Sequence, residues 1–169
     1  MAELVVDSWV HVQAIRNYKE VFGILLFRRI FTALPGVQVL FSFGHKYDLG
    51  AEEMYSDPGF LRHASNVTNL LDKSVNMLIN NSTAPLLAIL KAMGSRHVGY
   101  GLKSEHYPVI GESLIETLRG IVADQFTEEV EVAWVMIFGV ISSAMLEGAK
   151  EAEAADDSSE ESCNLKEIA

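Results

Sequence analysis

Hydrophobic residues recur every three or four positions along most of this chain, which is the spacing that places them on one face of an α-helix. The pattern predicts helices over about residues 3–16, 18–34, 57–79, 84–96, 104–123 and 127–149, with a short piece over 37–43. No segment alternates steadily between polar and apolar residues, and no Asn-Gly or Asp-Gly hairpin turn occurs. The sequence therefore predicts an all-α protein with about seven to eight helices.

Several helix boundaries are marked by residues that start or stop helices. Pro35-Gly36 stops the second predicted helix. Asp57-Pro58 combines a good N-cap side chain with a proline at the first helical position. Ser104 and Thr127 are predicted to cap the last two helices in the same way.

The length and charge fit one folded domain with an acidic extension. The chain has 169 residues, 49% of them hydrophobic, which is a globular composition. The net charge is −10, and residues 147–169 hold eight acidic side chains and two lysines. We predict a folded domain over residues 1–149 and an acidic, flexible tail over 150–169, which either only keeps the protein soluble or docks a basic partner such as a reductase.

Other features of the chain limit the classes of partner and the cellular compartment that we expect. The body is also acidic and has no stripe of lysine and arginine, so no nucleic-acid partner is expected. The most apolar run, residues 132–146, is shorter than the about 20 residues of a membrane span, so we expect a buried helix and no membrane partner. The N-terminus does not resemble a secretory leader, and the single Cys163 cannot form an internal disulfide. We therefore expect a cytoplasmic protein.

The histidines are the main candidates for chemistry, because no zinc-ligand spacing, Gly-rich phosphate loop or nucleophile elbow is present. His63 precedes Val67 by one turn and therefore points near the apolar face of its predicted helix. His97 comes directly after the predicted helix 84–96. From spacing alone, His63 can be an ordinary boundary residue, and His97 can simply interact with the carbonyl end of its helix.

Taken together and in order, the motifs of this chain resemble the globin family over about residues 3–148. The resemblance begins in the first helices and continues into the last. It is carried by Trp9, Leu26-Phe27-Arg28-Arg29-Ile30-Phe31, Pro35 with Phe41 six residues later, Phe60-Leu61-Arg62-His63 through Val67, Arg96-His97, and Ala133-Trp134. The segment Glu105-His106-Tyr107-Pro108-Val109-Ile110-Gly111-Glu112 is most similar to single-domain globins and flavohaemoglobins of bacteria.

The intervals between the key residues strengthen the resemblance. His63 occupies the position of the globin distal histidine, and His97 that of the proximal histidine. Phe27, Phe41, His63 and His97 follow one another at intervals of 14, 22 and 34 residues. These intervals are similar to those of the neuroglobin branch, apart from a small insertion before His97.

The resemblance implies a globin fold whose helices enclose one haem b. His97 would bind the iron through a neutral imidazole nitrogen, and its other N–H would bind a backbone carbonyl or a similar partner. Phe41 would stack on the porphyrin. The remaining residues that would line a dry haem pocket are Phe27, His63, Val67, Leu102 and Ile110.

Two roles are open for His63, which would face the sixth coordination site of the iron. It could donate a hydrogen bond to bound dioxygen, or it could bind the iron itself and give a bis-histidyl, six-coordinate haem. The pairing of Phe27 with His63 resembles neuroglobin and favours the second role. Around the pocket, Lys46, Arg62 and Lys103 are candidates to pair with the haem propionates, and His45 is either a haem-edge contact or an exposed loop residue.

The resemblance leaves three functions open. The first is a protein that binds dioxygen, nitric oxide or carbon monoxide reversibly and is not an enzyme. The second is a haem oxidoreductase, a nitric oxide dioxygenase or a nitrite reductase, that uses an external reductase. Bacterial flavohaemoglobins typically have tyrosine and glutamine where this chain has Phe27 and His63, which counts against nitric oxide dioxygenase activity without a partner. The third is a haem-free interaction module, against which the presence of both His63 and His97 argues.

Overall fold

The computed structural model describes residues 2–80 and 83–167, and within these ranges the chain is helical with no strand. This confirms the predicted all-α class. The α-helices are α1 (Ala2–Gln13), α2 (Tyr18–Ala33), α3 (Pro58–Ile79), α4 (Thr83–Gly99), α5 (His106–Val122) and α6 (Glu128–Glu167). The 3₁₀ helices are η1 (Pro35–Leu40), η2 (Gly44–Lys46), η3 (Glu52–Ser56) and η4 (Ala123–Gln125).

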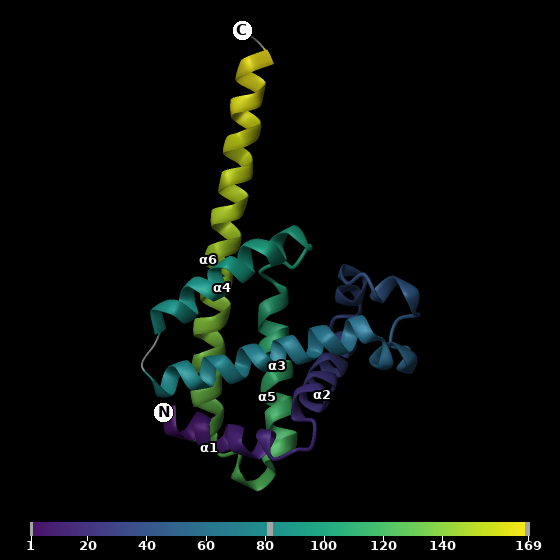
Figure 1. The fold of residues 1–169 in the computed structure, drawn as a ribbon, viewed down its shortest axis with the longest axis vertical. Coiled ribbons are helices and arrows are strands. Elements are labelled where there is room, and N and C mark those ends of the chain that lie inside the picture. The colour runs from purple at the N-terminus through teal and green to yellow at the C-terminus, as the bar shows by residue number, and fades with distance from the viewer. Residues whose placement is uncertain (1, 81–82, 168–169) are drawn as a thin grey trace.

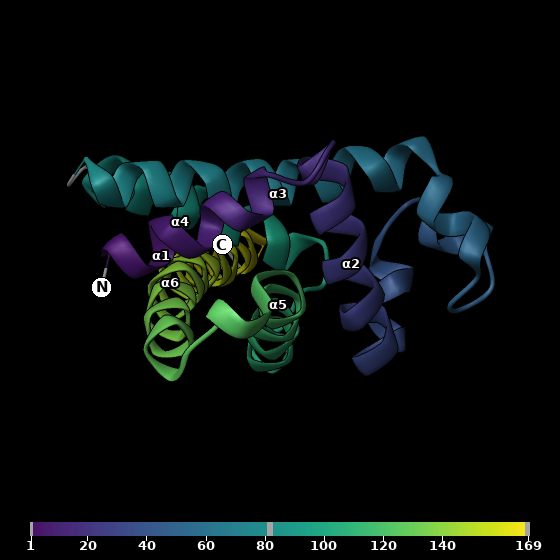
Figure 2. The ribbon, with the colours of Figure 1, turned by 90° about the horizontal axis from the view of Figure 1, so that it is seen from below.

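The helices form two crossing sets. α5 and α6 run side by side along the long axis of the molecule, and α3 and α4 lie across them (Figure 1). Figure 2, seen along α5 and α6, shows α3 covering one side and α1 lying between α3 and α6. α2 contacts both α3 and α5, and η1, η2 and η3 lie beyond it at the far end of α3.

An aromatic core joins the first helix to the last. Trp9 in α1 and Trp134 in α6 are both buried, and their ring centroids lie 5.5 Å apart. Phe22 meets Trp9 edge-on at 5.2 Å. The indole N–H of Trp134 donates a 2.9 Å hydrogen bond to the hydroxyl of Ser8, so the buried polar atom of the tryptophan is satisfied.

Two of the three predicted helix caps are confirmed. Asp57 accepts hydrogen bonds from the backbone N–H groups of Gly59 at 2.7 Å and Phe60 at 3.3 Å, and α3 starts at Pro58. The Thr127 hydroxyl lies 3.5 Å from the N–H of Val130 at the start of α6.

The prediction that Ser104 caps the helix was wrong, because α5 starts at His106 and no side chain caps this helix. The ring of His106 instead accepts a hydrogen bond from the N–H of Lys103, which closes the preceding turn. The backbone oxygen of Ser104 accepts the N–H of Tyr107 at 3.3 Å.

α6 departs from the sequence prediction in its length. The predicted helix ends at about Ala149, whereas α6 continues to Glu167. Residues 149–167 contain no glycine or proline and are rich in alanine and glutamate, which favour helix. Lys91 of α4 pairs with Glu147 and Glu151 on this part of α6. The flexibility of residues 150–169 stays a prediction.

The apolar run of α6 is buried on one face, so the predicted buried helix is confirmed for that face only. Its inward face packs on α1, α4 and α5. The outward side chains of Val132, Val135, Met136 and Val140 are 49–53% exposed. Residues Glu128–Asp156 of α6 have the length and composition of a membrane span, although core helices of globular proteins also have these properties.

Candidate functional site

One apolar cavity brings together all seven residues that the sequence singled out. It lies among α2, α3, α4, α5 and α6, with η1 at one side. The seven residues that line it are Phe27, Phe41, His63, Val67, His97, Leu102 and Ile110. Their sequence separation shows that the fold, not local chain geometry, assembles the cavity.

His97 occupies the last turn of α4 and is held in a defined orientation. Its Nδ1 lies 2.8 Å from the backbone oxygen of Met93, one turn earlier. A carbonyl oxygen can only accept a hydrogen bond, so Nδ1 carries the proton. In the neutral imidazole, this leaves Nε2 with the lone pair that a metal ligand requires. The backbone partner expected for this histidine is thus present.

His63 lies in the second turn of α3 with its imidazole against two phenylalanines. Its ring centroid is 4.9 Å from that of Phe41 and 5.3 Å from that of Phe27. Burial, and secondarily the charge of His97, lowers the pKa of His63 to about 4. The imidazole is therefore neutral at physiological pH and has a free nitrogen lone pair.

The local sequence explains why both histidines face the cavity. The Asp57 cap and Pro58 fix where α3 begins, which sets the rotation of His63 about the helix axis. His97 follows Met93 by four residues, and both line the cavity, so they share one face of α4. Two imidazoles thus project into the same apolar space.

The residues present fit a haem. Apart from the two histidines and the ring of Tyr107, the cavity is lined by aliphatic side chains, methionines and phenylalanines, which suit a porphyrin and exclude water. His97 offers an oriented neutral nitrogen for an iron. No group of three His, Cys, Asp or Glu side chains in the described residues is arranged to hold a bare metal ion. The two histidines therefore suit an iron that a porphyrin already holds.

The other candidate residues lie outside the cavity. His45 in η2 is exposed, and it does not line the cavity. Lys46 pairs with Asp57 at 3.1 Å, so its ammonium group already has a carboxylate partner. Arg62 is also exposed on α3, and Lys103 precedes α5. Their pairing with propionates stays a prediction.

Sequence reasoning missed a large part of the cavity wall. Met93 on α4 and Tyr107 and Leu114 on α5 line it, as do three side chains of α6. The three are Phe138, Ile141 and Met145. Their spacing of three and four residues is a helical face, and this periodicity was the signal available to find them.

Comparison with known proteins agrees with the cavity chemistry. The family model described as Globin matches residues 24–145, which is most of the chain. The chain is a globin. It is 31% identical to neuroglobin of Danio rerio over 145 residues, covering 86% of this chain and 87% of that one. It is 29% identical to leghemoglobin-1 of Lupinus luteus over 126 residues, covering 75% and 80%.

Solved structures show the same fold. A structure of ferric myoglobin from Aplysia limacina superimposes with a TM-score of 0.71 at 22% identity, covering 89% of this globin and 94% of the myoglobin. This globin is therefore a haem-binding protein by family. The cavity that holds His63 and His97 is where its residues fit that group.

Proposed function

We propose that this globin binds dioxygen and other diatomic ligands, such as nitric oxide and carbon monoxide, at the iron of a haem b. The observation that carries the proposal is the pair of imidazoles in one apolar cavity, with His97 oriented by the Met93 carbonyl. His97 would hold the haem, and the apolar walls would keep water and protons away from it. Relatives named neuroglobin and leghemoglobin support a ligand-binding role.

We also propose that His63 is the second iron ligand when no gas is bound. Its low pKa supports this role, because the lone pair of the neutral imidazole is available at physiological pH. The contacts of its ring with Phe27 and Phe41 hold it in place. When a gas takes that position, the same imidazole can donate a hydrogen bond to it from a protonated ring nitrogen.

The visible absorption spectrum of the purified protein tests both proposals. Ferric protein, reduced with dithionite under argon, should show sharp, resolved bands typical of low-spin iron with two histidine ligands. The His63→Leu variant should keep its haem and show the single broad band of five-coordinate iron. A broad band already in the unaltered protein would overturn the bis-histidyl assignment. A protein that takes up no haem after reconstitution would overturn the function.

A second candidate function is a haem oxidoreductase that acts on nitric oxide or nitrite with electrons from an external reductase. The exposed acidic side chains on the extension of α6, Glu151 and Glu153, favour docking of a basic protein there. Turnover of nitric oxide with a reductase and its pyridine nucleotide would support this function. Slow oxidation of the oxygen complex without turnover would favour oxygen binding. Either activity fits the cytoplasm, where we place this globin because its one cysteine has no partner in the chain.

A further inference from the structure

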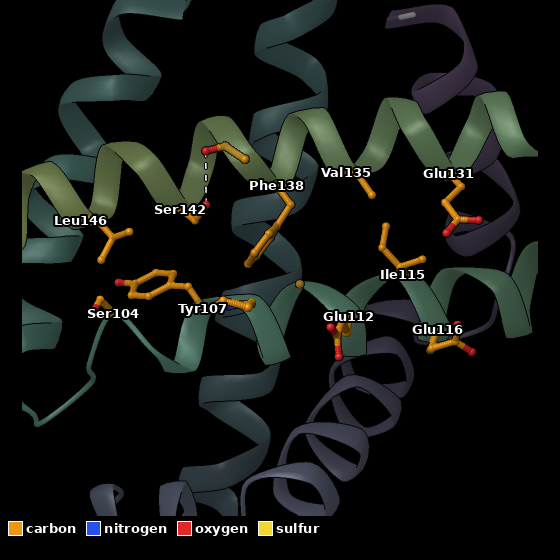
Figure 3. Close-up of a pocket in the computed structure, with 13 residues that line it drawn as sticks. Ser104, Tyr107, Glu112, Ile115, Glu116, Glu131, Val135, Phe138, Ser142 and Leu146 are labelled. Carbon is orange, nitrogen blue, oxygen red and sulfur yellow. Dashed lines mark hydrogen bonds between the residues drawn. The ribbon is translucent and has the colours of Figure 1, made fainter.

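A second, larger hollow lies outside the haem pocket, between α5 and α6 (Figure 3). Its volume is about 640 Å³, many times the roughly 30 Å³ that one water molecule occupies in the liquid. Apolar side chains from both helices face into it, and carboxylates lie toward one end, as Figure 3 shows. The apolar residues are Ile115, Val135, Phe138 and Leu146; the acidic ones are Glu112, Glu116 and Glu131.

Two side chains separate this groove from the haem pocket. Tyr107 of α5 and Phe138 of α6 line both spaces. In Figure 3 the Phe138 ring points from α6 toward α5, and the Tyr107 ring extends along α5 toward Leu146. Tyr107 is only 7% exposed, whereas Phe138 is partly exposed. These two side chains therefore form part of the wall that the surface groove and the haem pocket share.

Phe138 is the movable half of this wall. Its ring lies on the backbone of Gly111, where a Cβ atom would come within 2.7 Å of the ring carbon Cε1. The absence of a side chain at Gly111 lets the ring close against α5. The groove offers free space on the other side of the ring, and partly exposed side chains change rotamer within nanoseconds. A rotation of Phe138 into the groove would join the two spaces.

This opening would enter the haem pocket between α5 and α6, whereas His63 is carried by α3. Met145, two turns after Phe138 on α6, also lines the haem pocket, and its backbone lies directly against Gly94 of α4. His63 is packed against Phe27 and Phe41, which belong to α2 and to the residue after η1. A molecule that passes Phe138 therefore does not have to pass His63.

We propose that the α5–α6 groove is an access route for small uncharged gases, with Phe138 as its gate. The proposal rests on the proposed function, because the route leads to the haem pocket. Its apolar floor suits dioxygen, nitric oxide and carbon monoxide, which dissolve better in apolar surroundings than ions do. Glu116 and Glu131 both pair with Arg119, and together with Glu112 the three carboxylates leave a net negative charge at the groove. This charge disfavours anions, so nitrite should not use this route.

A plug in the groove tests the route without touching the haem pocket. Gly139 lines the groove, and a Cβ atom there would meet nothing within 4 Å, so a large side chain fits. Gly139→Trp should lower the bimolecular rate of carbon monoxide recombination after flash photolysis several-fold and raise the fraction that rebinds from inside the protein. Val140→Trp is the matched control, because Val140 is 53% exposed beside Gly139 and does not line the groove.

A second variant tests the gate. Phe138→Leu removes the ring and should raise the bimolecular rate several-fold, and adding Gly139→Trp should cancel that rise. Equal recombination rates in Gly139→Trp and Val140→Trp would overturn the route. A rise in Phe138→Leu that the plug does not cancel would also overturn it. If the protein forms no carbon monoxide complex, the visible spectrum shows this before any flash, and the haem function itself fails.

Discussion

Gly94 of α4 lies directly against the backbone of Met145 in α6. A Cβ atom at position 94 would come within 1.8 Å of the Met145 carbonyl oxygen. Gly148 makes a similar approach to the carbonyl oxygen of Lys91, at 2.0 Å. The two helices are therefore in backbone contact at two glycines, one on each helix. This contact sets the position of His97, which follows Gly94 by one turn.

Substitution of Gly94 by alanine should separate α4 from α6. The methyl group has no room, and the atom it meets is backbone, so the helices must shift. We expect Gly94→Ala to lower the free energy of unfolding by about 2 kcal/mol, as overpacking usually does. Urea denaturation followed by circular dichroism measures this change.

Gly139→Ala is the control for Gly94→Ala, because Gly139 of α6 lines the α5–α6 groove and a Cβ atom there has open space. Alanine is the better helix former by about 1 kcal/mol, so this variant should be as stable as the unaltered protein or more so. Equal urea midpoints for the two variants would contradict the close contact between α4 and α6.

The sequence predicted the parts of this site that depend on local chain geometry. The Asp57 cap and the helical spacing of apolar residues gave the position of α3, and so the direction of His63. The family motifs gave His97 and the lining residues Val67, Leu102 and Ile110, which do line one cavity. Each of these predictions uses residues within one helix or a conserved order of motifs.

What the sequence did not predict depends on which helix faces pair in three dimensions. The periodicity of α6 places Phe138, Ile141 and Met145 on one face, but it could not tell whether that face or the one with Val140 lines the cavity. The α5–α6 groove was missed for the same reason. The hydrogen bonds of Asp72 could not be predicted from the sequence either, since its partners Trp9 and Tyr18 lie 63 and 54 residues away.

Removal of the His97 imidazole should abolish stable haem binding. His97→Gly deletes the only oriented neutral nitrogen on the α4 side of the described cavity. We expect this variant to purify with little or no haem absorbance. Added imidazole should restore the absorbance, because the small ring can occupy the space of the missing side chain.

His45→Gly is the control for His97, since His45 is exposed and outside the cavity. It should keep a full haem spectrum without imidazole. Full haem binding by His97→Gly in the absence of imidazole would show that another residue holds the iron.

A partly buried hydrogen-bond cluster around Asp72 predicts that the free energy of unfolding changes at alkaline pH. Asp72 of α3 accepts hydrogen bonds from Trp9 of α1 at 2.5 Å and from the hydroxyl of Tyr18 in α2. Burial, and then the Asp72 carboxylate, raises the pKa of Tyr18 from 10.0 to about 12. The neutral phenol is therefore favoured in the folded protein.

The sign of the stability change follows from that raised pKa. Between pH 10 and about 12, the unfolded chain loses the Tyr18 proton while the folded chain keeps it, so the free energy of unfolding falls as the pH rises. Asp72→Asn should bring the pKa of Tyr18 down toward 10.0. Ultraviolet titration of tyrosinate measures this, and Tyr18→Phe should remove the late-titrating step. A late step that persists in Tyr18→Phe would assign it to another tyrosine.

Protonation of Asp57 should lower the free energy of unfolding at acid pH. The side chain is 5% exposed, and burial alone would raise its pKa. Hydrogen bonds from Lys46, the N–H groups of Gly59 and Phe60, and Tyr47 outweigh burial and lower the pKa below 3.8. The stabilisation from the charged carboxylate is therefore present above pH 3.8 and is lost as the pH falls through the lower, folded-state pKa.

Two variants separate the charge of Asp57 from its role as a cap. Asp57→Asn can still accept the N–H groups of α3, so it should remain folded at neutral pH and lose stability less steeply in acid. Asp57→Ala should lose the cap as well and be less stable than Asp57→Asn at neutral pH. Because α3 carries His63, loss of the cap should also broaden the haem spectrum. If the free energy of unfolding falls equally steeply in acid for the unaltered protein and for Asp57→Asn, other carboxylates control acid unfolding.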